Sequence, residues 1–401
     1  MNRRPNLTRA LVIAATCVIA SGFGRASKDS RLDDGLARTP PMGWNSWNRF
    51  HCDVSSQLIR ETADAMVASG MKEAGYQYVV IDDCWQVDRG ADGRIIADPA
   101  RFPEGMKALA DYVHAKGLKF GLYTDAGRRT CQGRPGSYGH EELDAKTYAE
   151  WGVDYVKIDW CNSQGLDART QYAKFRDALK QAGRPIVFSI CEWGFNQPWE
   201  WGSQTGHLWR TTNDISDRWV SMIQIIDRNA QYALAAGPGA WNDPDMLEVG
   251  NGGMTNDEYR AHFSMWAIMA APLIAGNDLR AMLGDGRQAT AIREILTNRE
   301  VIAVDQDSLG VQGMMVTNYP PELQVWVKPL ADGSRAVVLL NRASVPTTMT
   351  ALWNRIGITT DTAIVHDLWS HENAGRAVSR YSTTVPSHGA AMLRIEPVRP
   401  S

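Results

Sequence analysis

Short apolar runs alternate with amphipathic stretches from residue 40 to about residue 305 of the chain. Eight of the runs have the length and composition of buried strands: Met42–Trp44, Tyr78–Ile81, Lys119–Tyr123, Tyr155–Ile158, Pro185–Ile190, His207–Arg210, Gly239–Trp241 and Pro272–Ala275. Between them, apolar residues recur with the spacing of one helix face, over Leu58–Met71, Met106–Lys116, Asp144–Trp151, Ala168–Ala182, Arg218–Ala235, Thr255–Ala270 and Ala289–Leu296. Successive strand–helix units predict a (β/α)8 TIM barrel. A doubly wound open sheet is the alternative, but it would carry a Gly-rich phosphate loop after its first strand, and none is present there.

The pattern changes after about Asp307, where long helical periodicity stops. Short alternating runs separated by turn signals such as Asp332-Gly333 predict strands over Met314–Val316, Leu323–Val327, Ala336–Asn341, Thr347–Ala351, Ala363–Asp367 and Ala390–Ile395. Such a series is typical of a small antiparallel β-sandwich. We therefore expect an α/β chain with a TIM barrel over residues 27–308 and a β-sandwich over residues 309–401.

The first residues have the pattern of a bacterial secretory signal. Arg3, Arg4 and Arg9 form a basic segment, and the apolar run Ala10–Ala20 follows. This run is shorter than the ~20 residues that span a bilayer. Residues 1–26 are therefore predicted to be a signal peptide, cleaved after Ala20 or Ala26. The mature protein is expected to be secreted or periplasmic, without a membrane segment.

Composition narrows the classes of partner. Hydrophobic residues make up 44% and charged residues 22% of the chain, as in ordinary globular proteins. The formal net charge of -3 gives no basic footprint for nucleic acid. Trp is unusually frequent, at 15 residues. Core packing is the simpler interpretation of these rings, and stacking on sugars is the alternative.

The cysteines suggest disulfides at one end of the barrel. Without Cys17, which lies in the signal segment, five remain, so at least one thiol stays free. An exported chain favours disulfides, and no pair has the spacing of a zinc site. Pairing Cys52 with Cys84, and Cys131 with Cys161, would close loops of about 30 residues and stabilise by roughly 3–4 kcal/mol each. Cys191 would then be the free thiol.

The strongest chemical signal is the run from Asp154 to Cys161. Val156 and Ile158 alternate there with Lys157 and Asp159, which is the period of a strand. If the apolar pair faces the helices, Lys157 and Asp159 share the inner face. A buried ammonium would hold the carboxylate ionised, as a carboxylate nucleophile requires.

Other predicted strands also end in acidic and aromatic residues. These ends are Trp44-Asn45-Ser46-Trp47, Asp82-Asp83-Cys84-Trp85, Tyr123-Thr124-Asp125, Cys191-Glu192-Trp193, Trp209-Arg210 with Asp214 beyond, and Trp241-Asn242-Asp243-Pro244-Asp245-Met246. The carboxyl ends of barrel strands carry the chemistry of this fold. Carboxylates that hold hydroxyl pairs, together with flat rings, predict a sugar pocket.

Several of these acids have a second interpretation. Asp82 and Asp83 together could hold a divalent cation. Asp217 competes with Asp214, but it precedes a predicted helix and is expected to act as an N-cap. Asp243 and Asp245 flank a proline, and bracing of the loop is favoured over direct chemistry. The histidines follow no ligand spacing and are expected in the core or on the surface.

Together, these motifs resemble glycoside hydrolase family 27, the α-galactosidase family. The matching stretches occur in family order: Pro41–Trp47, Ile81–Trp85, Lys157–Cys161, Cys191–Gly194, Trp209–Arg210 with Asp214–Ile215, and Gly237–Leu247. The resemblance implies retaining hydrolysis of terminal α-D-galactosides, without a cofactor or metal. It also implies both disulfides. Animal members pair the cysteine at the position of Cys191 with another cysteine just before strand six. No cysteine occurs there in this chain, where the residues are Gly206-His207-Leu208. The chain therefore resembles plant and bacterial members.

The resemblance assigns a role to each matched position. Asp159 is implied as the nucleophile and Asp214 as the general acid/base. The remaining implied substrate-binding residues are Asp82 and Asp83 for the 4- and 6-hydroxyls, Lys157 and Arg210 for ring hydroxyls, Trp47 and Tyr123 in the same pocket, and Cys191 and Trp193 near the 2-position.

Rival activities exist within and outside this family. An α-N-acetylgalactosaminidase would need small residues where Glu192 and Trp193 stand. The substrate of a β-L-arabinopyranosidase lacks the 6-hydroxymethyl group, so the intact Asp82-Asp83 pair argues against that activity. A non-catalytic galactose-binding protein and a Mg²⁺-dependent phosphoryl-transfer enzyme are further alternatives. The leaving group remains open among raffinose-type sugars, galactomannan and glycoconjugates, and so does the oligomeric state.

Overall fold

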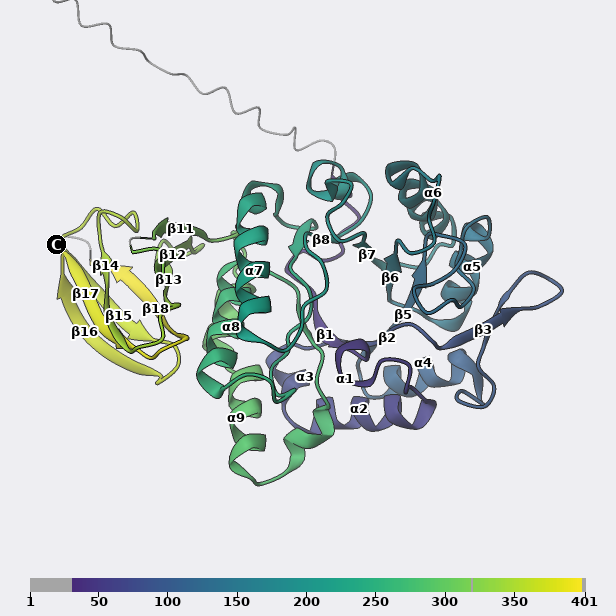
Figure 1. The fold of residues 1–401 in the computed structure, drawn as a ribbon, viewed down its shortest axis with the longest axis horizontal. Coiled ribbons are helices and arrows are strands. Elements are labelled where there is room, and N and C mark those ends of the chain that lie inside the picture. The colour runs from purple at the N-terminus through teal and green to yellow at the C-terminus, as the bar shows by residue number, and fades with distance from the viewer. Residues whose placement is uncertain (1–30, 319, 399–401) are drawn as a thin grey trace, which may run out of the picture. The chain divides into compact units, whose positions relative to one another are not determined.

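The computed structural model describes residues 31–318 and 320–398 of the 401-residue chain. The predicted signal peptide, residues 1–26, lies outside the described residues. Eight parallel strands form one sheet (Figure 1): β1 (Met42–Asn45), β2 (Tyr78–Ile81), β5 (Lys119–Asp125), β6 (Tyr155–Asp159), β7 (Val187–Cys191), β8 (Leu208–Arg210), β9 (Trp241–Asp243) and β10 (Leu273–Ala275). Their order is β10-β1-β2-β5-β6-β7-β8-β9, and a parallel bridge between Leu247 and Ala275 joins the two edges. The sheet therefore closes, which confirms the TIM barrel and rules out an open doubly wound sheet.

The side chains of β6 alternate between the interior of the barrel and the surrounding helices. Tyr155 belongs to a small apolar cluster inside the barrel, whereas Val156 and Ile158 belong to the large core between sheet and helices. Lys157 and Asp159 follow Tyr155 at a period of two residues and share its face. The alternation in the sequence thus placed the two charged side chains on the correct side of the strand.

Helices surround the sheet in the predicted order. They are α1 (Trp47–Phe50), α2 (Ser56–Ala68), α3 (Met71–Ala74), α4 (Gly105–Ala115), α5 (Glu141–Trp151), α6 (Ala168–Gln181), α7 (Trp219–Asn229), α8 (Asn256–Ile268), α9 (Arg287–Leu296) and α10 (Arg299–Asp305), with 3-10 turns η2 (Pro198–Glu200), η3 (Gly202–Gln204), η4 (Ala230–Ala235) and η5 (Leu279–Leu283). Local chemistry sets their ends. The Asp167 side chain accepts the Thr170 N–H at the start of α6, and Thr255 and Glu258 form a reciprocal capping box at the start of α8.

Three expectations about local structure need correction. The helix predicted over Leu58–Met71 breaks at Gly70, whose φ of +83° is left-handed and begins a separate short turn. The helix predicted over Arg218–Ala235 ends at Asn229 and continues as 3-10 turns. The predicted N-cap role of Asp217 is wrong, because Arg218 is the N-cap of α7 and Asp217 instead accepts hydrogen bonds from the Gly253 N–H and the Tyr259 hydroxyl. The short hairpin β3 (Gln86–Arg89) and β4 (Ile95–Ala97) was not predicted.

Antiparallel strands follow the barrel, as expected. Strands β11 (Met314–Thr317), β12 (Leu323–Pro329), β13 (Arg335–Asn341), β18 (Gly389–Pro397), β15 (Thr362–Asp367) and β16 (Glu372–Val378) form one sheet in this order, and β14 (Thr347–Leu352) pairs with β17 (Arg380–Val385). Met349 and Val385 from the pair share an apolar core with Val337, Leu339 and Leu393 from the larger sheet. The two sheets therefore pack as a sandwich.

Two of these sandwich strands, β16 and β17, escaped prediction because most of their side chains are exposed. Helix α8, nine of whose thirteen residues are buried, contacts strands β13 and β18 of the sandwich.

In the described part of the chain, no helix combines the length and the apolar character needed to cross a membrane.

Candidate active site

A small pocket opens where the strands of the barrel end. Its lining comprises Trp47, Asn48, Asp82, Asp83, Tyr123, Cys131, Lys157, Asp159, Trp193, Arg210, Asp214, Asp245 and Met246. Nine of the ten predicted site residues are in this set, and Cys191 is the exception. A larger hollow of about 980 Å³ borders the starts of β7 and β8, at the opposite ends of the strands, and includes none of these residues.

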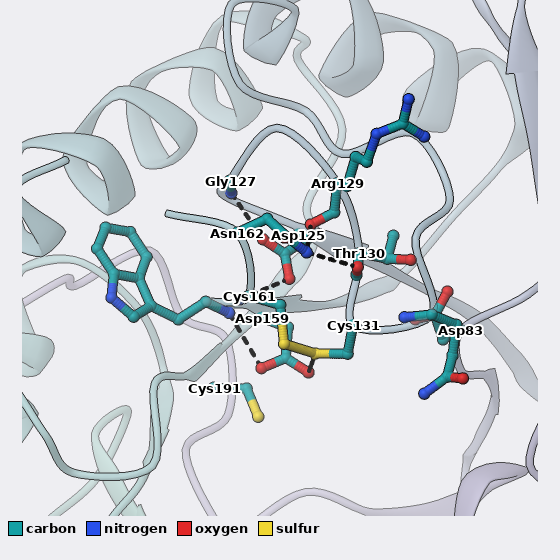
Figure 2. The surroundings of a disulfide bond; sticks show 12 residues. Asp83, Asp125, Gly127, Arg129, Thr130, Cys131, Asp159, Cys161, Asn162 and Cys191 are labelled. Atoms are coloured by element: carbon teal, nitrogen blue, oxygen red, sulfur yellow. Dashed lines mark hydrogen bonds between the residues drawn. A yellow bond between two sulfur atoms is a disulfide. The ribbon is translucent and has the colours of Figure 1, made fainter. Parts of the chain in front are cut away.

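Asp159 is the last residue of β6, and its carboxylate is nearly enclosed. The residue is 6% exposed. One carboxylate oxygen accepts the Trp160 N–H at 3.0 Å, and the other lies 3.5 Å from the sulfur of Cys131 (Figure 2). Burial raises the pKa of Asp159 to about 6, with Lys157 opposing the rise and the charges on Asp82 and Asp214 adding to it. Asp159 can therefore carry a negative charge at the end of a water-poor pocket.

The ammonium of Lys157 lies between carboxylates on the inner face of the barrel. Its Nζ donates to Asp82 Oδ2 at 2.8 Å. Burial lowers the pKa of Lys157, but the negative charge on Asp82, with that on Asp159, outweighs burial and holds it well above its ordinary value. The direct partner of Lys157 is thus Asp82, and it acts on Asp159 through space.

Protein donors surround the adjacent acids of the Asp82-Asp83 turn. Asp82 Oδ2 also accepts the Asn45 side-chain amide at 2.8 Å. The Asp83 carboxylate accepts the N–H groups of Gln132 at 3.0 Å and Cys84 at 2.7 Å, although burial raises its pKa. An ammonium and amides donate the hydrogen bonds that this pair accepts. That environment is suited to hydroxyl groups and argues against the cation site considered from the sequence.

Asp214 lies on the loop after β8, at the open side of the pocket. Its side chain is 63% exposed. Its Oδ1 accepts hydrogen bonds from Arg210 Nη2 at 3.0 Å and from the Trp193 indole at 3.2 Å. Partial desolvation raises the pKa of Asp214, but the positive charges on Arg210 and Lys157 prevail and leave it below the ordinary value. Without a ligand, Asp214 is therefore an ionised carboxylate in contact with solvent.

Arg210 joins Asp214 to a second acid, Asp245, that the sequence did not single out as a pocket residue. Arg210 Nη2 lies 3.0 Å from Asp245 Oδ2, and Asp245 also accepts the Ile215 N–H at 2.8 Å. Burial raises the pKa of Asp245 to about 6, and Arg210 opposes the rise. Asp245 therefore braces the loop that carries Asp214. This agrees with the bracing role favoured from the sequence, and Asp245 also lines the pocket. Nothing in the local sequence signals its contact with Arg210.

Cys191 lies behind the pocket wall. It is the free cysteine of the described residues, it is buried, and its Sγ lies 3.7 Å from Arg210 Nη1. Burial raises the pKa of this thiol well above its ordinary value. The structure thus places Cys191 against a pocket residue and outside the pocket lining.

Both expected disulfides, Cys52–Cys84 and Cys131–Cys161, are present. Figure 2 shows the second bridge against the Asp159 carboxylate, with Asp125 on its other side. Asp125 accepts the N–H groups of Gly127 at 2.7 Å and Cys161 at 2.9 Å, and burial, with the charge on Asp159, raises its pKa to about 9. The two sulfurs are bonded to each other, so this group of acids and cysteines does not offer thiolates to a metal ion.

Comparison with known proteins identifies the family of the chain. The family model described as "Alpha galactosidase A" matches residues 39–307, and the "Alpha galactosidase C-terminal beta sandwich domain" matches residues 321–395. The chain belongs to the α-galactosidase family of glycoside hydrolases. An α-galactosidase from Cyamopsis tetragonoloba is 51% identical over 91% of this chain and 88% of its own length. α-Galactosidase A from Cellvibrio japonicus is 50% identical, over 90% of this chain and 93% of its own.

Solved structures show the same family. α-Galactosidase I from Mortierella vinacea superposes with a TM-score of 0.87 and 37% identity, covering 92% of this chain and all of that one. A β-L-arabinopyranosidase from Geobacillus stearothermophilus has a TM-score of 0.81 but only 25% identity, over 91% of this chain and 98% of its own. The family therefore contains more than one activity on a shared fold, and the pocket must decide between them.

Proposed function

We propose that the protein is a retaining exo-α-galactosidase in which Asp159 is the nucleophile and Asp214 is the general acid/base. One observation carries this proposal: carboxylates from the end of β6 and from the loop after β8 line a single small pocket. The pocket is small and its lining is dominated by carboxylates, cationic groups and aromatic rings, which suits one sugar ring at the end of a chain.

In the first step, a carboxylate oxygen of Asp159 bonds to the anomeric carbon of galactose. The bond between that carbon and the glycosidic oxygen breaks, and the leaving oxygen takes the proton of Asp214. In the second step, Asp214 removes a proton from water, and the water oxygen bonds to the anomeric carbon as the bond to Asp159 breaks. Galactose leaves with its original anomeric configuration. The two carboxyl groups are expected to lie roughly 5–5.5 Å apart, as in retaining enzymes.

The pocket floor accounts for the choice of sugar in this proposal. Asp82 and Asp83 hold the 4- and 6-hydroxyls as acceptors, and Lys157 donates from the same side. The ring stacks against aromatic groups of Trp47 and Tyr123. Arg210 and Trp193 bound the side next to Asp214, which leaves the anomeric carbon facing both acids.

The proton on Asp214 requires a change in its surroundings. In the free protein its pKa lies below the ordinary value, so the proton donor is a minor form. A leaving group bound over this exposed carboxyl would exclude water and raise its pKa. Binding of the substrate thus favours the protonated form of Asp214, which is the proton donor.

Rival substrates of the same family fit the pocket less well. On an arabinopyranoside, which has no 6-hydroxymethyl group, the Asp82-Asp83 pair would lose one of the two hydroxyls that it is proposed to hold. Trp193 occupies space on the wall where a 2-acetamido group would lie. The family also includes an α-N-acetylgalactosaminidase from Gallus gallus, 43% identical over 334 residues, so this rival must be tested directly.

The test is a panel of nitrophenyl α-galactoside, α-N-acetylgalactosaminide and β-L-arabinopyranoside, with the first product anomer followed by NMR. We expect the highest kcat/KM on the galactoside and α-galactose as the first product. First release of β-galactose, or a preference for either rival, would overturn the assignment. A fully folded protein that binds galactose without turnover would establish the non-catalytic alternative.

Export and domain limits are part of the same proposal. The disulfides support an oxidising compartment, in agreement with a secreted or periplasmic enzyme that has lost residues 1–26. We place the boundary between the domains at residues 308 and 309, between α10 and β11.

The substrate is a terminal α-galactoside of an oligosaccharide, galactomannan or glycoconjugate. One structural relative, from Saccharomyces cerevisiae, was solved with raffinose.

A further inference from the structure

The disulfide Cys131–Cys161 lies between two carboxylates at the ends of neighbouring barrel strands. Asp125 and Asp159 are paired in register on β5 and β6, and Figure 2 shows the two sulfurs between their side chains. One oxygen of Asp159 lies 3.5 Å from the Cys131 sulfur. The ligand atoms of these four residues, which we call the bridge cluster, all lie within 4.8 Å of one another.

This convergence is a product of the fold. The two cysteines are 30 residues apart in the sequence, so no local zinc motif signals them. In the described part of the chain, no other group of three or more His, Cys, Asp or Glu side chains comes together as closely. The other disulfide, Cys52–Cys84, is not part of such a group and therefore offers a matched control.

The oxidation state of the sulfurs decides what the bridge cluster can bind. The thiolate is the form of cysteine that binds metals, and a disulfide has none. A small dithiol breaks the S–S bond by exchange: two electrons pass to the protein, two protein thiols form, and the dithiol becomes a cyclic disulfide. Cys131 is exposed and lines the pocket, so a reductant of this size has a path to its sulfur.

The donor set of the reduced cluster fits a zinc ion. Zn²⁺ takes four ligands at the corners of a tetrahedron, about 2.3 Å from a thiolate and about 2.0 Å from a carboxylate oxygen. A sulfur and an oxygen on one such ion are therefore about 3.5 Å apart. The Cys131 sulfur and the Asp159 oxygen already have this separation. Thiolate ligands also favour Zn²⁺ over Mg²⁺ and Ca²⁺, which prefer oxygen alone.

Groups around the cluster hold its ligands and balance their charge. One Asp159 oxygen accepts the Trp160 N–H, which leaves the other directed at Cys131. The Tyr123 hydroxyl donates to the Cys131 sulfur at 3.5 Å, as outer-shell partners of metal ligands do. Four anionic ligands exceed the charge of Zn²⁺, and the ammonium of Lys157, on the same face of β6 as Asp159, compensates part of the excess.

We propose that reduction converts the bridge cluster into a binding site for one Zn²⁺ ion and that this ion switches the enzyme off. The ligands release their protons to solvent as the metal–ligand bonds form. The Asp159 oxygen that faces Cys131 then donates its electron pair to the ion and is lost as a nucleophile. Binding of the metal is independent of the proposed function, whereas the inhibition rests on it.

The test measures bound metal and activity before and after reduction. The protein is reduced anaerobically with dithiothreitol, separated from the dithiol by gel filtration and incubated with ZnCl₂, beside an unreduced sample. We expect one zinc per chain by atomic emission after reduction and none without it. Hydrolysis of α-galactosyl fluoride should cease in the zinc-loaded sample and return when a chelator removes the ion. MgCl₂ should neither bind nor inhibit.

Cobalt identifies the ligands without reference to activity. Co²⁺ in place of Zn²⁺ should give the thiolate-to-metal charge-transfer absorption and the intense visible bands of a tetrahedral sulfur-ligated ion. Weak octahedral bands without charge transfer would show that the thiols do not bind the metal, which would overturn the site.

Variants assign the metal to the bridge cluster. After reduction, the double variant Cys131→Ser, Cys161→Ser should bind no zinc, whereas the control Cys52→Ser, Cys84→Ser should bind as the wild type does. Asp125→Asn keeps the disulfide and the side-chain shape. Because it weakens a direct ligand, it should lower zinc affinity by at least the ~10–100-fold that loss of an outer-shell partner costs.

Each outcome decides one part of the proposal. A reduced wild-type protein that binds no zinc, or equal binding by the two double variants, would overturn the site. Reduction that unfolds the barrel with and without zinc, followed by near-ultraviolet circular dichroism, would overturn it as well. Bound zinc with unchanged kcat on the fluoride would overturn the switch alone. An unreduced protein that hydrolyses no α-galactoside would overturn the proposed function and leave the metal measurements valid.

Discussion

Among residues 31–318 and 320–398, Lys157 is the one cation that contacts the buried acid Asp82, and replacing it with methionine would remove that contact. The Lys157 side chain is 12% exposed and the Asp82 side chain 3% exposed, with 2.8 Å between Nζ and Oδ2. Methionine keeps much of the side-chain volume and none of the charge. Asp82 would retain the Asn45 amide as a donor. The perturbation therefore isolates the charge of Lys157 from its packing.

The expected loss of stability depends on pH. Breaking a buried ion pair from one side costs about 3–5 kcal/mol, because the remaining charge is uncompensated. Lys157 also opposes the effect of burial on the pKa of Asp159, which is about 6, so the pKa of Asp159 rises further in the folded variant. A raised pKa contributes stability below the unfolded pKa, and this contribution is lost as the pH rises through the folded pKa. Relative to wild type, Lys157→Met should lose about 3–5 kcal/mol at neutral pH and less near pH 4, where Asp159 is protonated in both proteins.

Catalysis should change in the same variant. Lys157 opposes the effect of burial on Asp159, whose pKa is about 6. Without the cation the pKa of Asp159 rises further, and each unit lowers the ionised fraction tenfold at lower pH. Hydrolysis of α-galactosyl fluoride, which needs no proton donor, should fall most below pH 6 and recover as the pH rises.

The loss of stability is measured by urea unfolding near pH 4 and pH 7.5, and Lys157→Arg is the charge-retaining control. The effect on catalysis is measured as the pH dependence of kcat with the fluoride. An equal loss of stability at both pH values would refute the reasoning. So would a loss below about 1 kcal/mol at neutral pH, because Lys157 would then not compensate a buried carboxylate.

Three further predictions concern the same pocket. In the wild type, kcat/KM on a disaccharide should decline above about pH 6. The kcat/KM on α-galactosyl fluoride should instead rise through the pKa of Asp159 and then level off. Parallel pH profiles for the two substrates would contradict the separate roles of the two acids. Asp245→Asn leaves Asp214 as the acidic partner of Arg210, so the pKa of Asp214 should fall. The variant's kcat/KM should therefore decrease more on the disaccharide than on the fluoride. Equal decreases on both substrates would count against this coupling. Replacing Cys131 and Cys161 together with serine should lower the free energy of unfolding by roughly 3–4 kcal/mol, measured in urea, and reduce kcat because Asp159 loses the bridge beside it; wild-type stability would show that the bridge constrains little.

The barrel was predictable because its signals are local. The alternation of Val156 and Ile158 with Lys157 and Asp159 identified both the strand and the face that carries the chemistry. Parallel strands converge at one end, so residues far apart in the chain could be assigned to one pocket without coordinates. The exposed strands β16 and β17 were missed because few of their side chains are buried. Their sequence therefore lacks the apolar alternation that marks a half-buried strand.

Residues whose roles depend on distant partners were harder to predict. Asp217 was expected to cap the helix that follows it, but Gly253 and Tyr259 hold its carboxylate instead. Asp245 was assigned to its own loop, and its contact with Arg210 depends on the neighbouring strand end. The family resemblance placed Cys191 near the sugar; its Sγ lies 3.7 Å from Arg210 Nη1, and the residue is not part of the pocket lining. In each case the sequence identified the loop, and the fold decided which group the side chain meets.

The configuration of the galactosyl azide formed by rescued variants tests the central claim most directly. In Asp159→Ala, hydrolysis of an activated aryl α-galactoside should be almost abolished at a wild-type Tm, and azide should attack from the face vacated by the carboxylate and give β-galactosyl azide. In Asp214→Ala, azide should instead attack the galactosyl-enzyme and give α-galactosyl azide. NMR of the two products distinguishes these results. Full activity of Asp159→Ala, or the same azide anomer from both variants, would contradict the assignment of a nucleophile on β6 and an acid/base after β8.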